Sequence, residues 1–217
     1  MCVAEVTGVQ ETAASGETLK SAVAVSLFSL LAISASAQGQ NPAAQGGPPV
    51  LARELAPARY GTRLLVTSPA FSSGATINER YTQNGDNMSP SLDWAKVPAG
   101  TRSVAVFVED AGVNRPEPIT HWIVYNMPSS MRSLPSQTPG DASLPAGVMQ
   151  GKNMSGNPGY LGPKPPAGQT HAYYFQVFAL NTTLDIDPGS ADRMTLINAM
   201  KVHVLASGSV IGRYTGQ

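Results

Sequence analysis

Glycine and proline recur along most of the chain and divide it into short segments. There are 21 Gly and 18 Pro among 217 residues, a share near the upper end for a globular protein. Residues 135–147 and 151–168 are too rich in both for helix. Between such loops lie runs rich in Val, Ile, Tyr and Phe, a composition typical of strands buried on at least one face. We predict five strands, at residues 63–67, 103–110, 121–127, 172–180 and 209–214.

One segment alone has a clear helical pattern. Residues 193–206 carry apolar side chains near the helical period, with Ser190 or Asp192 as the N-cap and Gly208 as the stop. Strands that do not alternate with helices favour an antiparallel arrangement. The predicted fold class is therefore mainly β: an antiparallel β-sandwich with long Gly/Pro-rich loops and a helix near the C-terminus.

The N-terminal residues resemble a secretory leader. Residues 21–37 are apolar, follow Lys20 and end in the small residues Ala35-Ser36-Ala37, which predicts a signal peptide over residues 1–37, cleaved after Ala37. An uncleaved amphipathic or membrane-anchoring helix is the alternative. Residues 38–59, rich in Gln, Pro, Gly and Ala, predict a flexible linker, and residues 60–217 the folded domain. We expect a periplasmic or secreted protein with no stable membrane insertion after leader cleavage.

Charge and cysteine content exclude several function classes. The 14 Lys and Arg balance 14 Asp and Glu, so no basic surface for nucleic acid is expected. The single cysteine, Cys2, lies in the predicted leader. The mature chain can therefore form no disulfide and offers no thiol nucleophile.

Three side chains that could carry chemistry lie at predicted strand ends. Asp110 ends one strand, and His121 and His171 each open another beside a Gly/Pro-rich loop. If these ends meet, the imidazoles and nearby backbone N–H groups would favour a phosphate or carboxylate. Two alternatives stay open: the histidines merely satisfy backbone groups, or the three residues form a two-His, one-carboxylate metal set. Against an enzyme, the chain has no HExxH and no GxSxG motif.

The order of motifs resembles one known family. The segments are SPAF (68–71), YTQNGDNMSPSLDW (81–94), VFVED (106–110), THWIVYNMP (120–128), GYLGP (159–163) and HAYYF (171–175). Together they resemble the phosphatidylethanolamine-binding protein (PEBP) family, in its Raf kinase inhibitor-like branch, from about Leu64 to Tyr214.

This resemblance implies a non-enzymatic binding protein with a small anion pocket at one end of a β-sandwich. The pocket would accept phosphate-type groups such as a phospholipid head group, with no cofactor and no metal. The ligand-binding residues implied by position are Asp110, His121, Gly162, Pro163, His171 and Tyr173. The alternative function is a protein–protein inhibitor of a protease or kinase, which would dock through the pocket loops.

The chain departs from the family pattern at two places. Gly112 stands at the second acid of D-P-D-x-P, and Ala172 replaces the arginine of H-R-Y. Lys164, inside the second loop, could supply a compensating charge. Both imidazoles are expected to donate to the anion, so affinity should weaken above about pH 7, where an unperturbed imidazole is neutral.

Overall fold

The structure is a computed structural model that describes residues 47–137 and 144–217. Its helices and strands are α1 (Ala52–Leu55), β1 (Val66–Thr67), η1 (Glu79–Tyr81), β2 (Leu92–Trp94), β3 (Ser103–Asp110), β4 (Ile119–Pro128), β5 (Ser133–Leu134), β6 (Met149–Gly151), β7 (Thr170–Leu180), η2 (Pro188–Ser190), α2 (Arg193–Met200) and β8 (Val204–Thr215).

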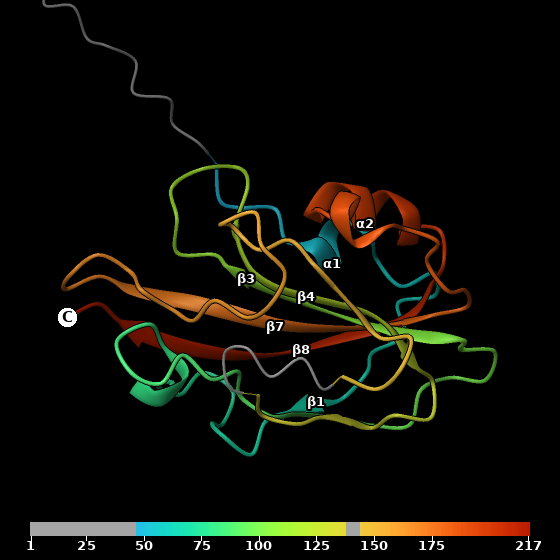
Figure 1. Cartoon of the computed structure of the whole chain (residues 1–217), viewed down its shortest axis with the longest axis horizontal. Helices are drawn as coiled ribbons and strands as arrows, with labels where there is room; N and C mark the ends of the chain where they lie inside the picture. Colours follow the sequence, from blue (N-terminus) through green and yellow to red (C-terminus); the bar gives the residue numbers. More distant parts are fainter. Residues whose placement is uncertain (1–46, 138–143) are drawn as a thin grey trace, which may run out of the picture. The chain divides into compact units, whose positions relative to one another are not determined.

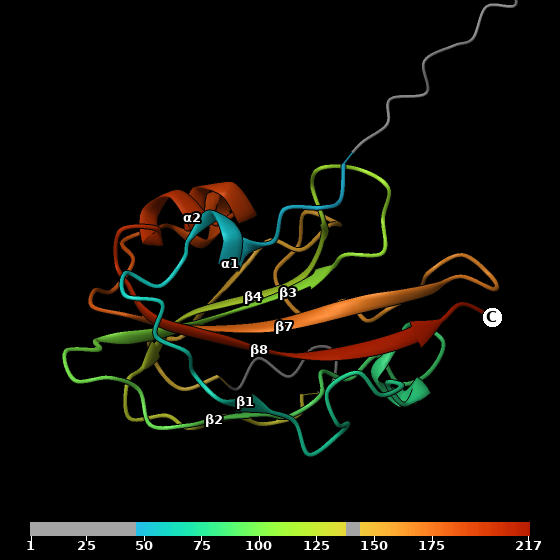
Figure 2. The same ribbon diagram turned by 180° about the vertical axis from the view of Figure 1, so that it is seen from behind.

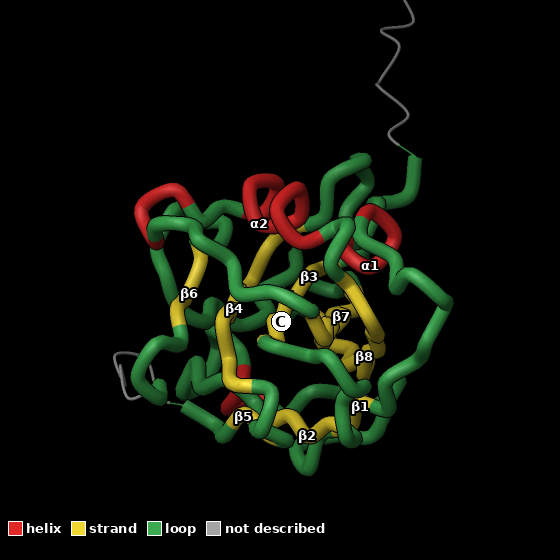
Figure 3. Tube along the Cα trace, turned by 90° about the vertical axis from the view of Figure 1, so that its right-hand side faces the viewer, coloured by secondary structure: helices red, strands yellow, loops and turns green. Residues whose placement is uncertain are grey.

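The described residues form three layers. A five-stranded antiparallel sheet, in the order β6-β4-β3-β7-β8, lies in the middle, and a three-stranded antiparallel sheet, β1-β2-β5, covers one of its faces. Helices α1 and α2 lie on the opposite face (Figures 1 and 2). The end-on view shows the helices, the large sheet and the small sheet in succession (Figure 3). The predicted β-sandwich is thus confirmed.

Each face of the large sheet has its own apolar core. Alternate side chains of β3 point to opposite faces: Val106 and Val108 join the core beneath the small sheet, whereas Phe107 joins the core beneath the helices. All eight residues of β3 are buried, as expected of a central strand covered on both sides. Trp122 is also fully buried in the core beneath the small sheet.

The predictions were good for three long strands and poor for the others: β8 (Val204–Thr215) was predicted only over residues 209–214, and only Val66–Thr67 of the predicted strand at 63–67 forms β1. Strand β3 has the predicted bounds, and β4 and β7 extend the predictions by one to two residues at an end. Strands β2, β5 and β6 are only two or three residues long, so they show no alternation over a useful length.

The predicted helix at 193–206 is too long. Asp192 is the N-cap, and its Oδ1 accepts a hydrogen bond from Thr195 N at 2.8 Å, but α2 ends at Met200 and His203 lies in the turn that follows. From Val204 onward the chain pairs with β7, with Val204 opposite Leu180. Gly208 therefore lies within a strand and does not stop a helix.

The flexible linker predicted at 38–59 is wrong for residues 51–56. This segment forms α1, and Leu51, Ala52 and Ala56 are buried in the protein. Apolar residues spaced along one helical turn against the large sheet fix it in place despite a composition rich in Pro and Ala. The predicted leader lies outside the described residues, so the cleavage site and the localisation stay predictions. None of the helices in the described ranges is long and apolar enough to cross a membrane.

Candidate functional site

Three strand ends meet at one edge of the large sheet. Because the sheet is antiparallel, the end of β3 lies beside the starts of β4 and β7. Asp110 is opposite Ile119 of β4 on one side and Tyr173 of β7 on the other. The predicted convergence of Asp110, His121 and His171 therefore occurs.

His121 sits on a β-bulge. Val108 pairs with Trp122 and Glu109 with Thr120, which leaves His121 as the extra residue of β4. A bulge of this kind re-aims a side chain and frees its backbone from the ladder. The freed carbonyl of His121 accepts from Leu161 N at 2.9 Å, and His121 Nδ1 donates to the Leu161 carbonyl at 2.5 Å. The bulge thereby ties the start of β4 to the Gly162-Pro163 loop.

Asp110 holds the two segments beside it. Its Oδ2 lies 2.7 Å from His171 Nδ1, and its Oδ1 accepts from Gly112 N at 2.7 Å. The His171 ring lies directly over Gly112. A Cβ at position 112 would come within 2.6 Å of His171 Cβ and 2.7 Å of its Cδ2. The missing second acid therefore leaves the space that the imidazole occupies.

The Gly162-Pro163 loop is anchored from a distant part of the sequence. Gln83 Nε2 donates to the Gly162 carbonyl at 2.6 Å, and Gln83 N donates to the Pro163 carbonyl at 3.1 Å. Asn87, with a left-handed φ of 54°, accepts from Gly162 N through its Oδ1 at 2.7 Å. A Cβ at Gly162 would lie 2.8 Å from that same Oδ1, so glycine is needed for this close approach.

A cavity of about 290 Å³ opens beside these residues. Its lining residues come from five separate segments: Gln83, Asp110, Ile119 and His121, Met154 and Ser155, and Leu161 and Lys164. The exposed Lys164 provides the one ammonium group of this set.

The predicted site residues take three different places around this cavity. Asp110 and His121 line it. His171 and Tyr173 are buried and are not part of the lining; the Tyr173 ring centroid lies 5.2 Å from that of His121 and 6.5 Å from that of His171. Gly162 and Pro163 shape the loop through their backbone and do not line the cavity either.

Only one of the two imidazoles is available to a ligand in the cavity, which differs from the expectation that both would donate. His171 is engaged by Asp110, and its Nε2 lies 3.4 Å from Gln169 Oε1. Within the described residues, His121 Nε2 and the Tyr173 hydroxyl are buried and have no hydrogen-bond partner. Buried polar atoms are usually hydrogen-bonded, which makes these two atoms candidates for contact with a ligand.

Burial governs the protonation of both groups. Burial lowers the pKa of His121 below its ordinary 6.5; the hydrogen bond to the Leu161 carbonyl and the negative charge of Asp110 oppose this, whereas His171 adds to it. The neutral ring has its proton on Nδ1, because a carbonyl can only accept, so Nε2 carries a lone pair. Burial, together with the Asp110 charge, raises the pKa of Tyr173; its phenol therefore stays protonated.

Sequence reasoning missed most of the cavity wall. Gln83 lies in a motif that the sequence analysis used for the resemblance alone, and Met154 and Ser155 lie in a Gly-rich loop without a chemical signature. Across residues 47–137 and 144–217, no three His, Cys, Asp or Glu side chains are grouped so that they could hold a metal ion. The metal set considered for Asp110, His121 and His171 thus has no geometric support.

Two known proteins are similar to this chain in sequence. The UPF0098 protein of Methanothermobacter thermautotrophicus is 40% identical over 146 residues, covering 67% of this chain and 94% of that protein. The Escherichia coli UPF0098 protein YbhB is 39% identical over 134 residues, covering 61% and 84%.

Solved structures show the same fold. Escherichia coli YbcL, described as a new member of the mammalian PEBP family, aligns with a TM-score of 0.67 and 29% identity over 72% of this chain and all of that one. The PEBP homolog CT736 of Chlamydia trachomatis aligns with a TM-score of 0.63 and 31% identity, over 72% and 99%. Since the family model described as phosphatidylethanolamine-binding protein also matches residues 67–215, the chain belongs to that family of binding proteins.

Proposed function

We propose that the protein is a non-enzymatic binding protein for small ligands that carry a phosphate-type group, held in the cavity beside His121. The observation that carries this proposal is the buried, unpartnered Nε2 of His121 at a cavity of about 290 Å³. Imidazolium and ammonium groups are good partners for an oxyanion, and Lys164 supplies the ammonium at the wall.

The surrounding residues hold the groups of the site in fixed orientations. Asp110 fixes the His171 ring and the Gly112 backbone with its two oxygens. Leu161 fixes the His121 ring through Nδ1, which aims Nε2. Because the Asp110 carboxylate also lines the cavity, a ligand with a cationic group beside its phosphate fits better than inorganic phosphate. Phosphorylethanolamine is such a ligand.

Calorimetric titration of the folded protein tests this proposal. Phosphorylethanolamine should bind more tightly than inorganic phosphate. At a pH below the lowered pKa of His121, where Nε2 is protonated, His121→Ala should weaken this affinity by about 10- to 100-fold, the value of one charge-assisted hydrogen bond. His171→Ala should also weaken it, because Asp110 loses its partner. The matched control is His203→Ala, since His203 bonds Asn181 at 2.8 Å in the turn after α2, away from the cavity wall. If the folded wild type binds neither ligand, the proposal fails and docking to a protein target becomes the better hypothesis.

The pH dependence follows from the His121 pKa. At neutral pH the ring is neutral, so Nε2 can donate to an oxyanion only after protonation. Affinity for an anion should therefore rise as the pH falls through the lowered pKa of His121, below 6.5. This revises the expected window near pH 7, which assumed an unperturbed imidazole.

Sulfate is the appropriate probe, because it stays a dianion across this range whereas phosphate itself titrates. A titration between about pH 5 and 8, the range in which imidazoles change charge, should show tighter binding at the acid end. The His121→Ala variant, which keeps Asp110 and His171, should show a flatter profile. An equally steep profile in this variant would assign the pH dependence to a group other than His121 and contradict the role of His121.

A further inference from the structure

A second cavity, of about 540 Å³, lies between the N-terminal segment and β8. Its walls carry two arginines and several hydroxyls: Arg53, Thr62, Arg63, Ser207 and Ser209. It shares no lining residue with the cavity at His121. Its volume is in the usual range for small-molecule sites, roughly 300–1,000 Å³.

The fold holds both walls in fixed positions. On one side, Leu64 N donates to the Ser207 carbonyl at 2.9 Å, and Ser207 N donates to the Thr62 carbonyl at 3.2 Å. Gly208 permits this approach, because a Cβ there would collide with the Leu64 carbonyl oxygen. On the other side, Ala52 N donates to Glu109 Oε2 at 2.8 Å, which holds α1 on the sheet.

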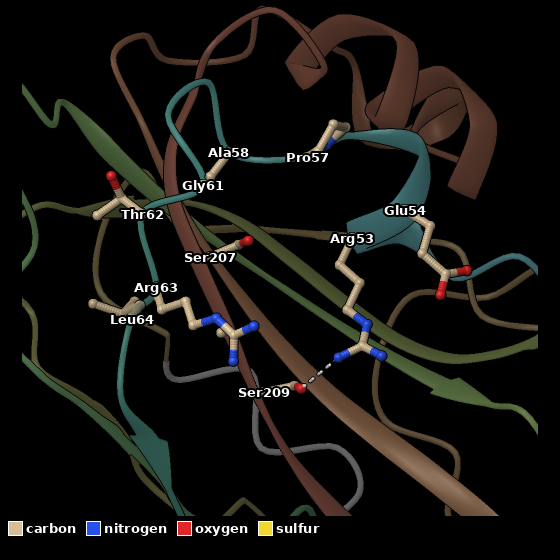
Figure 4. Close-up of a pocket in the computed structure, with 11 residues that line it drawn as sticks. Arg53, Glu54, Pro57, Ala58, Gly61, Thr62, Arg63, Leu64, Ser207 and Ser209 are labelled. Carbon is tan, nitrogen blue, oxygen red and sulfur yellow. Dashed lines mark hydrogen bonds between the residues drawn. The ribbon is translucent and has the colours of Figure 1, made fainter.

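The two guanidinium groups approach Ser209 from opposite sides (Figure 4). Arg53 reaches Ser209 Oγ at 3.4 Å and lies over the Tyr174 ring, 5.1 Å from its centroid. The Arg63 side chain has no hydrogen bond or ion pair to any residue that the structure describes. Neither arginine has a carboxylate partner in this part of the chain.

The one acid of the cavity wall does not neutralise the pair. Glu54 Oε2 accepts from Leu51 N at 2.9 Å, and its carboxylate points away from both guanidiniums in Figure 4. The concave surface between Arg53 and Arg63 is therefore positively charged, with hydroxyl donors at its floor.

We propose that this cavity is a second binding site, which takes the phosphoryl group of a small molecule between Arg53 and Arg63. A guanidinium presents a rigid fork of donors that matches the oxygens of such a group. A phosphoryl group can accept from two forks at once, and its dianionic form matches their two charges. The Ser209 hydroxyl lies between the forks and completes the set of donors.

Residue-resolved NMR on the full chain tests the proposal, with inorganic phosphate as the probe and chloride at equal ionic strength as the reference. Saturable shifts are expected at the backbone amides of Ser207 to Ser209 and at the side-chain Nε–H groups of Arg53 and Arg63. Arg63→Gln should weaken binding there by about tenfold or more. Because the Arg63 side chain has no described partner, this variant should fold normally. Arg59→Gln, in the same segment but outside the cavity wall, is the matched control and should leave the affinity unchanged.

The outcomes separate the two sites. The second site is supported if the shifts at residues 207–209 saturate with phosphate and if Arg63→Gln weakens this binding while Arg59→Gln does not. This holds whatever happens at the first site. Shifts confined to Leu161 and Gly162 overturn the second site and leave the proposed function standing. Shifts at 207–209 that do not saturate, or that chloride reproduces, also overturn it, as does an equal loss in the Arg59→Gln control.

Discussion

Replacing Glu109 with alanine is expected to lower the free energy of unfolding by about 3–5 kcal/mol, the usual cost of removing one partner of a buried ion pair. Glu109 is fully buried in β3, and its Oε1 accepts from Arg193 Nε at 2.7 Å. Without the carboxylate, the Arg193 charge would stay buried and unpaired, which is the main source of the cost.

Glu109 also connects three parts of the chain. Its Oε2 accepts from Ala52 N at 2.8 Å and from Gln176 Nε2 at 2.7 Å. Arg193 in turn donates through Nη2 to the Val50 carbonyl at 2.7 Å. The substitution should therefore loosen the N-terminal segment from the sheet as well as lower the stability.

Chemical denaturation measures the loss of unfolding free energy. Amide hydrogen exchange at residues 50–56 measures the loosening of the N-terminal segment. The matched control is Arg80→Ala, which breaks an ion pair with Asp86 at 3.9 Å whose side chains are 52% and 64% exposed. Exposed pairs contribute about 0–1 kcal/mol, so this variant should be nearly as stable as the wild type. Equal losses in the two variants would show that burial of the Glu109 pair has no special energetic consequence.

The long elements could be predicted because their signal is local. Strand β3 is an uninterrupted apolar run between two polar loops, and Asp192 is a common N-cap residue. Strand β8 was predicted too short because Val204 to Ala206 fit a helical pattern equally well. Only the pairing with β7, which the sequence does not display, decides between the two.

The candidate site shows the same division. Asp110, His121 and His171 could be predicted because polar residues at strand ends stand out against apolar runs. The bulge at His121 depends on how β4 pairs with β3, and the role of Gln83 depends on a contact 79 residues along the chain. Neither the bulge nor the Gln83 contact produces a pattern in the neighbouring sequence. The burial of Leu51, Ala52 and Ala56 was missed for the same reason: Glu109, which accepts from Ala52 N, lies far away in sequence.

Gly112→Ala is expected to disturb the candidate site by crowding the His171 side chain. The added Cβ would meet the base of the His171 side chain, at 2.6 Å from Cβ and 2.7 Å from Cδ2. The ring cannot relieve this by a small rotation, because Nδ1 is held by Asp110 at 2.7 Å. Either the Asp110–His171 contact breaks or the 110–112 backbone shifts, with an overpacking cost of about 1–3 kcal/mol.

The measurement is the imidazole ¹⁵N spectrum of His171, together with the unfolding free energy and the affinity for phosphorylethanolamine. In Gly112→Ala the His171 signals should move and the affinity should fall, because Asp110 no longer positions both of its neighbours. Gly47→Ala is the matched control, since a Cβ at Gly47 meets nothing within 4 Å; it should change none of the three observables. An unchanged His171 spectrum in a folded Gly112→Ala protein would mean that the ring does not need the space above Gly112. In that case the Asp110–His171 contact would not depend on having glycine, rather than the second acid of the family pattern, at position 112.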